Sequence, residues 1–198
     1  MKKVLGIVFL GAVLLTTTHK SFGASDLKKI YHVRLETDKG NIELEVDGIH
    51  APISTQNFLK YLSKNFYNGG SFFRTVTMAN QPDNQVKIEV IQAGPEKQNE
   101  NAFPPIALER TSVTGLHHLN GTLSMARNGP DTATSNFFIC IHDQPELDFG
   151  GKRNPDGQGF AAFGHVTSGM DIVDLIQVSP AQGQTLTPPI LINRAVVF

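Results

Sequence analysis

The chain has 198 residues, of which 40% are hydrophobic and 18% are charged, and its formal net charge is −1. This length and composition fit one soluble globular domain with a sizeable core, and they leave little room for a second domain. A charge so close to neutral excludes the basic surface typical of nucleic-acid-binding domains. Cys140 is the only cysteine, so no disulfide can form within the chain. Because Cys140 lies in an apolar run, we expect it to be buried rather than nucleophilic.

The beginning of the chain has the pattern of a secretory signal peptide. A pair of lysines precedes an apolar run over residues 4–15, and small residues lead up to position 24. We therefore predict a signal peptide over 1–23, followed by a short lead-in over 24–30. A membrane anchor is the alternative, but this run of about 12 apolar residues is shorter than the roughly 20 that a spanning helix needs. The pattern predicts a periplasmic or secreted protein with no stable membrane association after cleavage.

The rest of the chain, 31–198, is predicted to form a single domain that begins with a hairpin. Apolar and polar residues alternate over 31–37 and again over 41–46, with a tight turn between the two segments. Pro52 then stands at a favourable first helical position, and the apolar spacing after it predicts a helix to about Ser63.

Strand-like segments dominate the remaining sequence. Ser168 is predicted to cap a second helix, and a turn-rich connector is expected over 183–189. About eight strands and two helices favour a mostly β fold, a closed eight-stranded antiparallel barrel with two capping helices, over a parallel α/β sheet. The predicted strands after the hairpin are 72–76, 86–92, 116–125, 137–141, 160–166 and 190–197.

The most specific segment lies at 121–141, where two apolar runs flank a polar loop of turn residues. It contains Ser124-Met125-Ala126, then Gly129-Pro130, then Ser135-Asn136-Phe137-Phe138-Ile139. This segment resembles the cyclophilins, whose barrel carries Ser-Met-Ala-x-x-Gly-Pro-x-x-x-x-Ser-Gln-Phe-Phe-Ile. The resemblance extends from about Tyr31 to Phe198, through the runs Phe66–Arg74, Val90–Gly94, Glu146-Leu147-Asp148, Phe160–Gly164 and Pro188-Pro189-Ile190.

The resemblance implies a peptidyl-prolyl cis-trans isomerase, an enzyme of the isomerase class, and assigns Arg74 as its catalytic residue. Rotation about an X–Pro bond is slow because it breaks amide resonance. A fixed donor near the prolyl nitrogen stabilises the twisted amide more than either planar form, which is catalysis by differential binding. Arginine suits this role because it stays protonated and presents several donors on a rigid fork. The spacing alone favours an ordinary surface ion pair for Arg74.

The resemblance also assigns the substrate-binding positions. A prolyl ring needs a small apolar pocket, and the peptide backbone beside it needs hydrogen-bonding partners. Judged without the resemblance, the apolar residues of this set would be plain barrel core. The set comprises Val90, Phe138, Leu147 and Phe160 for the proline, and Gln92, Ala126, Arg127 and Asn136 for the peptide, with Arg127 acting through its main chain.

Several positions depart from the family pattern. Asn136 replaces a glutamine, Glu146 replaces an aromatic residue, and Glu89 stands where a pocket phenylalanine is usual. The chain between Arg74 and Gln92 is also longer than the common family spacing by roughly ten residues. The residues that remain open as replacements for the missing phenylalanine are Val86, Ile88 and Met78, or none of them.

These departures keep a second hypothesis open, a cyclophilin-like chaperone module that binds proline-containing segments without turning them over. A third is an assembly partner that makes contact through loop 78–84 or loop 150–159.

Under the isomerase hypothesis, the implied partners are proline-containing unfolded or nascent exported polypeptides. We expect a monomer that does not bind nucleic acid. No cofactor is implied. We also expect no metal site, since the rings of His117 and His118 would point to opposite faces of a strand.

Overall fold

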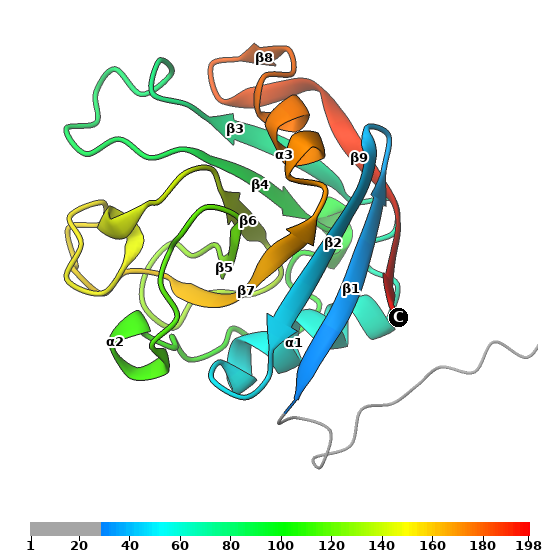
Figure 1. Cartoon of the computed structure of the whole chain (residues 1–198), viewed down its shortest axis with the longest axis horizontal. Helices are drawn as coiled ribbons and strands as arrows, with labels where there is room; N and C mark the ends of the chain where they lie inside the picture. The colour runs from blue at the N-terminus through cyan, green and yellow to red at the C-terminus, as the bar shows by residue number, and fades with distance from the viewer. Residues whose placement is uncertain (1–28) are drawn as a thin grey trace, which may run out of the picture.

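The structure, a computed structural model, describes residues 29–198 as an antiparallel β-barrel (Figure 1). The predicted signal peptide and most of the lead-in lie outside the described residues. Eight strands close the barrel in the order β1-β2-β7-β5-β6-β4-β3-β9, and pairing of β1 with β9 completes the ring. The two-residue strand β8 pairs with β9 alone. The strands are β1 (Ile30–Thr37), β2 (Gly40–Asp47), β3 (Ser71–Val76), β4 (Val90–Gly94), β5 (Thr122–Met125), β6 (Phe137–Cys140), β7 (Ala161–Ser168), β8 (Ala181–Gln182) and β9 (Thr185–Val197).

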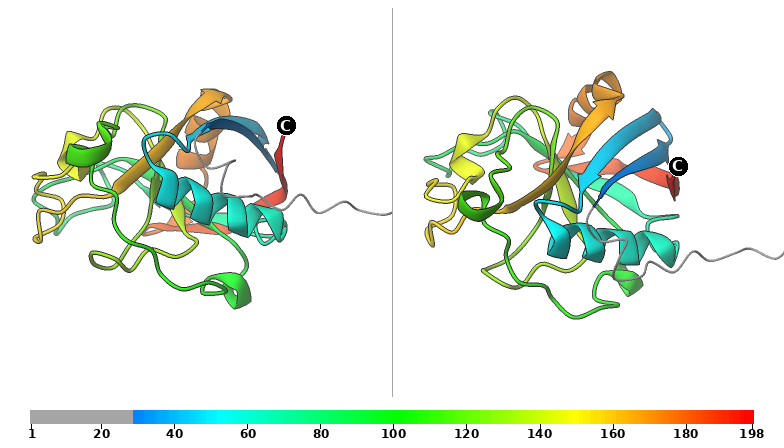
Figure 2. Two further views of the ribbon diagram at one scale, coloured as in Figure 1. Left: turned by 90° about the horizontal axis from the view of Figure 1, so that it is seen from below. Right: turned by 60° about the horizontal axis from the view of Figure 1, so that its bottom comes forward.

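The predicted eight-stranded barrel is therefore confirmed, and the described residues contain three α-helices instead of two. Helix α1 (Pro52–Ser63) and helix α3 (Met170–Gln177) appear at opposite ends of the view in Figure 1, and Figure 2 shows α1 running across one end of the barrel. The third helix, α2 (Thr111–Thr114), is a single turn. Two 3₁₀ turns complete the regular structure, η2 (Lys97–Asn99) and η3 (Pro145–Leu147). No helix in the described part of the chain is long and apolar enough to cross a membrane.

Two predicted strands are shorter in the structure because side chains take their backbone hydrogen bonds. The strand predicted over 86–92 begins only at Val90. Before it, the side-chain amide of Gln81 donates to the carbonyl of Ile88 and its oxygen accepts from the Ile88 amide, at 2.7 and 3.3 Å. The strand predicted over 116–125 begins only at Thr122, because side-chain oxygens accept the backbone N–H groups of 116, 118 and 119.

The end of the chain also departs from the prediction. Strand β9 begins at Thr185 rather than at residue 190, because Thr185 and Leu186 pair with β8 in a hairpin that replaces the expected connector. Ser168 does not cap α3, since it is still part of β7. Gly169 caps the helix with a φ of 89°, and a Cβ at that position would lie 2.3 Å from the carbonyl oxygen of Asn41.

The core inside the barrel is rich in aromatic side chains. Phe58 of α1 is fully buried, and its ring centroid lies 5.1 Å from Tyr67 and 5.4 Å from both Phe137 and Phe163. These contacts attach the helix to the sheet. Cys140 is buried as predicted, and burial raises the pKa of its thiol well above the usual value.

A second, smaller apolar cluster lies on the other face of the sheet. Successive strand residues point to opposite faces, so Phe137 belongs to the main core and its neighbour Phe138 to the second cluster. Fully or nearly buried members of this cluster are Val76, Ile88, Val90, Phe138, Cys140 and Leu147, and Ala126 and Phe160 pack against it. The second cluster forms the floor of the cavity described next.

Candidate functional site

A cavity of about 410 Å³ lies over the second apolar cluster. Its volume is within the usual range for small-ligand sites. Every residue predicted as catalytic or substrate-binding lines this cavity, namely Arg74, Val90, Gln92, Ala126, Arg127, Asn136, Phe138, Leu147 and Phe160. The structure therefore brings together residues that are up to 86 positions apart in the chain (74 to 160).

Strand pairing explains how the central residues meet. Arg74 of β3 is the register partner of Gln92 in β4, and Gln92 is the partner of Phe138 in β6. Directly paired residues on neighbouring strands have adjacent side chains. The three residues therefore form a row across the sheet, with the cation at one end and the aromatic ring at the other.

The guanidinium of Arg74 is held in place by neutral amide oxygens. Its Nη1 donates to Oε1 of Gln92 at 2.8 Å, and its Nε and Nη2 donate to Oε1 of Gln184 at 2.9 and 2.6 Å. Gln184 lies in the turn between β8 and β9 and was not predicted as a site residue. Its own amide donates to the carbonyl of Asn80 at 3.1 Å, which links it to the long β3–β4 connection.

Arg74 keeps its charge without an acidic partner among residues 29–198. Burial lowers its pKa, and the positive charge of Arg153 lowers that pKa further. An arginine side chain nevertheless stays protonated at neutral pH because its ordinary pKa is so high. The alternative interpretation of Arg74 as an ordinary surface ion pair is not supported, since its hydrogen-bond acceptors are uncharged.

The apolar wall of the cavity is built on Phe138, Val90 and Leu147, which are 5%, 3% and 0% exposed. The ring of Phe160 meets that of Phe138 edge to face, with centroids 5.3 Å apart. Ile88 also lines the cavity, so among the candidates for the missing phenylalanine it is the one at the site. Met78 is 53% exposed, and the Glu89 side chain instead contacts His142 and Gln177.

Arg127 has its guanidinium held inside the protein by three hydrogen bonds. It forms a two-point ion pair with Asp156 at 2.8 and 2.9 Å, and its Nε donates to the carbonyl of Gly159 at 2.7 Å. The hydrogen bond from Arg127 is the main reason that the pKa of Asp156 falls to about 2. The guanidinium also lies over the Phe160 ring, 5.0 Å from its centroid. The Arg127 side chain is only 2% exposed, so its main chain is the part that we expect to meet a bound peptide.

Asn136 presents an acceptor that lacks a partner. Its Oδ1 is buried and has no hydrogen-bond partner among the described residues. Its side chain packs against Gly94, where a Cβ would lie 1.8 Å from Oδ1, so the chain needs glycine at that position. Buried polar atoms are normally paired, and this oxygen is an exception that Gly94 covers.

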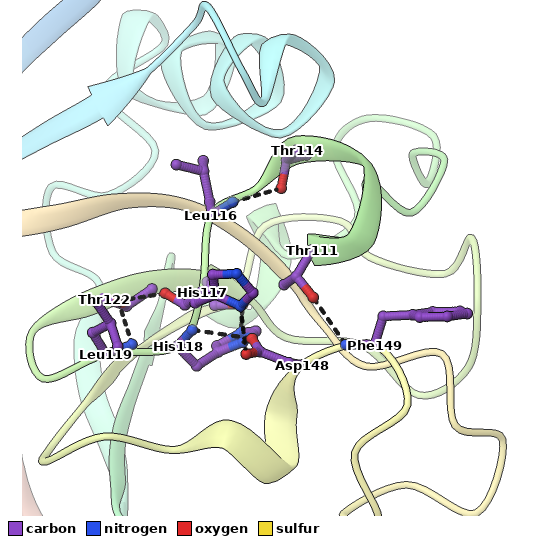
Figure 3. Close-up of polar contacts among 10 residues, drawn as sticks. Thr111, Thr114, Leu116, His117, His118, Leu119, Thr122, Asp148 and Phe149 are labelled. Carbon is purple, nitrogen blue, oxygen red and sulfur yellow. Dashed lines mark hydrogen bonds and ion pairs between the residues drawn. The ribbon is translucent and has the colours of Figure 1, made fainter.

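His117 and His118 do not point to opposite faces of a strand, and that prediction is wrong. Both rings contact the same carboxylate, with Nδ1 of His118 2.6 Å from Oδ1 of Asp148 and Nδ1 of His117 2.8 Å from Oδ2 (Figure 3). The backbone N–H of His118 donates to Oδ1 as well, at 3.1 Å. The segment is irregular rather than a strand, and for that reason adjacent side chains can converge.

The buried ring of His118 supports the cavity from behind. Its Nε2 lies 2.9 Å from the hydroxyl of Ser124, and its ring stacks on Phe138 with centroids 6.0 Å apart and planes 14° from parallel. Burial of Asp148 would raise its pKa, but the hydrogen bonds of His118 and His117 hold that pKa below the usual value. No group of three or more His, Cys, Asp or Glu side chains within residues 29–198 is arranged to hold a metal ion.

The sequence matches the family described as cyclophilin type peptidyl-prolyl cis-trans isomerase over residues 32–197. It is 36% identical over 175 residues to peptidyl-prolyl cis-trans isomerase A of Dickeya dadantii, covering 84% of each chain. It is 34% identical over 149 residues to peptidyl-prolyl cis-trans isomerase B of Escherichia coli, covering 73% of this chain and 83% of that protein.

Solved structures share the fold. A crystal structure of a cyclophilin type peptidyl-prolyl cis-trans isomerase of Cryptosporidium parvum matches with a TM-score of 0.69 at 20% identity, covering 86% of this chain and 98% of that one. A crystal structure of the same protein in the presence of the dipeptide Ala-Pro matches with a TM-score of 0.68, also at 20% identity, covering 84% and 98%.

The position of Asp148 predicts a pH-dependent contribution to stability. We expect Asp148→Asn to lower the free energy of unfolding by about 1.5–3 kcal/mol near pH 5, because it removes the charge from partly buried hydrogen bonds. Since the folded-state pKa lies below the ordinary value of 3.8, this contribution is present above that pH and is lost as the pH falls through the folded-state pKa. Denaturant unfolding of both proteins between pH 5 and pH 2 measures the difference. A difference that stays constant over this range would contradict the view that the ionised carboxylate of Asp148 provides the stabilisation.

Proposed function

The chain belongs to the cyclophilin-type peptidyl-prolyl cis-trans isomerases, and we propose that Arg74 accelerates X–Pro rotation in the cavity by stabilising the twisted amide. The observation that carries this proposal is a guanidinium at the cavity, held by two neutral amide oxygens beside an apolar wall. In this arrangement, the wall takes the prolyl ring and the cation lies next to the bond that rotates.

The chemistry needs no covalent intermediate. As the amide twists, its nitrogen loses conjugation with the carbonyl and becomes a better hydrogen-bond acceptor. A donor fixed near that nitrogen interacts more strongly with the twisted form than with either planar form, which lowers the barrier. Arg74 supplies such a donor. Its bonds to Gln92 and Gln184 fix the guanidinium before substrate arrives, so little reorganisation is needed during rotation.

The apolar wall accounts for the selection of proline. Phe138, Phe160 and Leu147 form an apolar surface that a pyrrolidine ring can cover, with the edge-to-face aromatic pair held in place by His118 from behind. Burial of such a ring is favourable in proportion to the apolar area removed from water. The Cryptosporidium parvum crystal structure in the presence of Ala-Pro supports a proline-containing peptide as the substrate class.

Polar groups beside the wall suit the peptide backbone. Gln92 uses its Oε1 to accept from Arg74, which leaves its side-chain amide as a donor for a peptide carbonyl. Asn136 also lines the cavity, and a side-chain amide there suits a peptide backbone. We assign both residues, with Ala126 and the main chain of Arg127, to binding the peptide on either side of the proline.

Arg74→Ala tests the assignment. We expect kcat/KM for a short X–Pro peptide to fall by about 10²–10³-fold, the usual cost of removing one preorganised electrostatic donor. Isomerisation is measured by NMR exchange between the cis and trans peptide signals. Arg34→Ala is the matched control, because Arg34 lies in β1 and forms its ion pair with Glu43, away from the cavity. A mutant that retains wild-type activity with an intact fold would show that another residue catalyses the rotation.

A peptide-binding chaperone without turnover remains the second candidate. The shorter Asn136 and the unpartnered state of its oxygen are the observations that favour it. The same NMR experiment separates the two functions. Saturable shifts of the peptide signals without faster exchange would support the binding module, whereas faster exchange supports the isomerase.

We further propose that the protein acts after export, on unfolded or nascent exported polypeptides whose X–Pro bonds convert slowly. The support is the basic and apolar pattern at the beginning of the sequence, which lies outside the described residues. On this proposal the exported protein is a periplasmic or secreted monomer.

Export predicts a defined new N-terminus. When the full chain is expressed in a Gram-negative bacterium, the protein recovered from the periplasmic fraction should begin at Ala24 with the sequence Ala-Ser-Asp. N-terminal sequencing, or the intact mass, measures this directly. Recovery of an uncleaved chain from the cytoplasmic fraction alone would contradict the proposal.

A further inference from the structure

The charges that line the cavity are not balanced. Three arginines line it, and one of them, Arg127, is neutralised by its ion pair with Asp156. Arg74 and Arg153 have only uncharged acceptors among residues 29–198. Burial lowers the pKa of Arg74, and the positive charge of Arg153 lowers it further. Two uncompensated cations therefore share one cavity.

Arg153 is fixed in position by the long β3–β4 connection. Its Nη1 donates to Oε1 of Gln81 at 2.9 Å and to the carbonyl of Val86 at 2.7 Å. Both acceptors belong to the segment between Arg74 and Gln92 that exceeds the common family spacing. The Nε and Nη2 groups of Arg153 have no acceptor in the described part of the chain. An arginine presents five N–H donors, so most of its donors remain available to a bound molecule.

The nearby acids do not neutralise this pair. Glu100 is the one acid among the residues that line the cavity, and within residues 29–198 its carboxylate forms no ion pair or hydrogen bond with Arg74 or Arg153. Its neighbour Asn101 contacts Thr134, which places this end of the cavity beside the loop before β6. Glu146, in the 3₁₀ turn η3 before the loop that carries Arg153, directs its carboxylate to the backbone N–H of Lys152 at 2.7 Å and not to the guanidinium of Arg153.

We propose that Arg153 is a specificity-determining residue that binds a carboxylate of the peptide close to the proline, so that this protein prefers acidic X–Pro segments. The inference rests on the proposed function, because it takes the same cavity as the peptide site. It names a substrate class, a proline with a carboxylate nearby, and the residue that selects it.

The physical argument is charge compensation in a partly buried site. Two like charges in a cavity raise each other's energy, and a carboxylate placed beside them relieves that repulsion. Charge-assisted hydrogen bonds from a guanidinium to a carboxylate are also stronger than bonds to neutral acceptors. Arg74 is already engaged by Gln92 and Gln184, so the carboxylate pairs with Arg153. Arg153 then acts on the affinity for the peptide, and Arg74 acts on the rotation.

The test compares matched peptides on the mature protein. Acetylated and amidated X–Pro peptides carry Glu, Gln or Lys at one position beside the proline, on either side in separate sets. A further neutral peptide ends in a free carboxylate, which separates a side-chain carboxylate from a terminal one. Affinity is measured by fluorescence anisotropy of the labelled peptides, and kcat and KM are measured by NMR exchange and coupled assays.

The variants are Arg153→Gln, Arg153→Lys and the control Lys152→Gln. Lys152 is exposed and does not line the cavity, so its removal changes the net charge of the same loop by the same amount. Arg153→Lys keeps the charge and reports whether the shape of the loop, rather than the charge, decides the preference.

We expect the wild type to bind the Glu peptide of at least one set, or the peptide with the free terminus, about three- to tenfold more tightly than the neutral peptide, mainly through KM. Arg153→Gln should abolish this ratio, while Lys152→Gln and Arg153→Lys should keep most of it. The absence of any preference in the wild type would overturn the inference. A ratio that survives in Arg153→Gln, or that is lost in Arg153→Lys as well, would also overturn it.

Failure of the proposed function gives a different result. An acidic preference in affinity that depends on Arg153, without faster exchange for any peptide, would support the inference and contradict the catalytic role of Arg74. Faster exchange for all peptides with no acidic preference would support the isomerase function and overturn the inference about Arg153.

Discussion

The site depends on a guanidinium that keeps its positive charge because neutral amides, rather than carboxylates, hold it in place. Arg74 is partly buried, and burial alone works against its charge by lowering its pKa. The amide oxygens of Gln92 and Gln184 satisfy its donors without cancelling the charge. A carboxylate in either position would pair with Arg74 and weaken the field at the substrate. The barrel therefore brings two distant amides, from β4 and from the β8–β9 hairpin, to one arginine of β3.

The two faces of the sheet have different roles, since one packs the main core and the other lines the cavity. Phe137 faces the interior and packs with the aromatic core around Phe58, whereas Phe138 faces the cavity. The cavity wall has its own support, because the His118 ring stacks on Phe138 and is held by Asp148 and Ser124. The wall is thus ordered before a proline arrives, which keeps down the entropy cost of binding.

Much of the barrel could be predicted from the local alternation of apolar and polar residues, whereas the predicted cavity-lining residues were identified through the resemblance of short motifs to the cyclophilins. The motif around Phe138 and the position of Arg74 are examples. Gln184 and Arg153 could not be predicted, because Gln184 meets Arg74, and Arg153 is positioned at the cavity, through contacts with residues far away in the sequence. The late starts of two strands were missed for a related reason, since side chains such as that of Gln81 occupy the backbone groups that a strand would use.

The most direct test of this account is the substitution Gln184→Glu, measured by NMR exchange on a short X–Pro peptide with the unfolding curve as a check on the fold. The change keeps the size of the side chain and places a carboxylate against Nε and Nη2 of Arg74. We predict that isomerisation slows by about tenfold or more, because an ion pair weakens the electrostatic stabilisation of the twisted amide. An unchanged or faster rate in a folded variant would contradict the claim that the uncompensated charge of Arg74 drives the rotation.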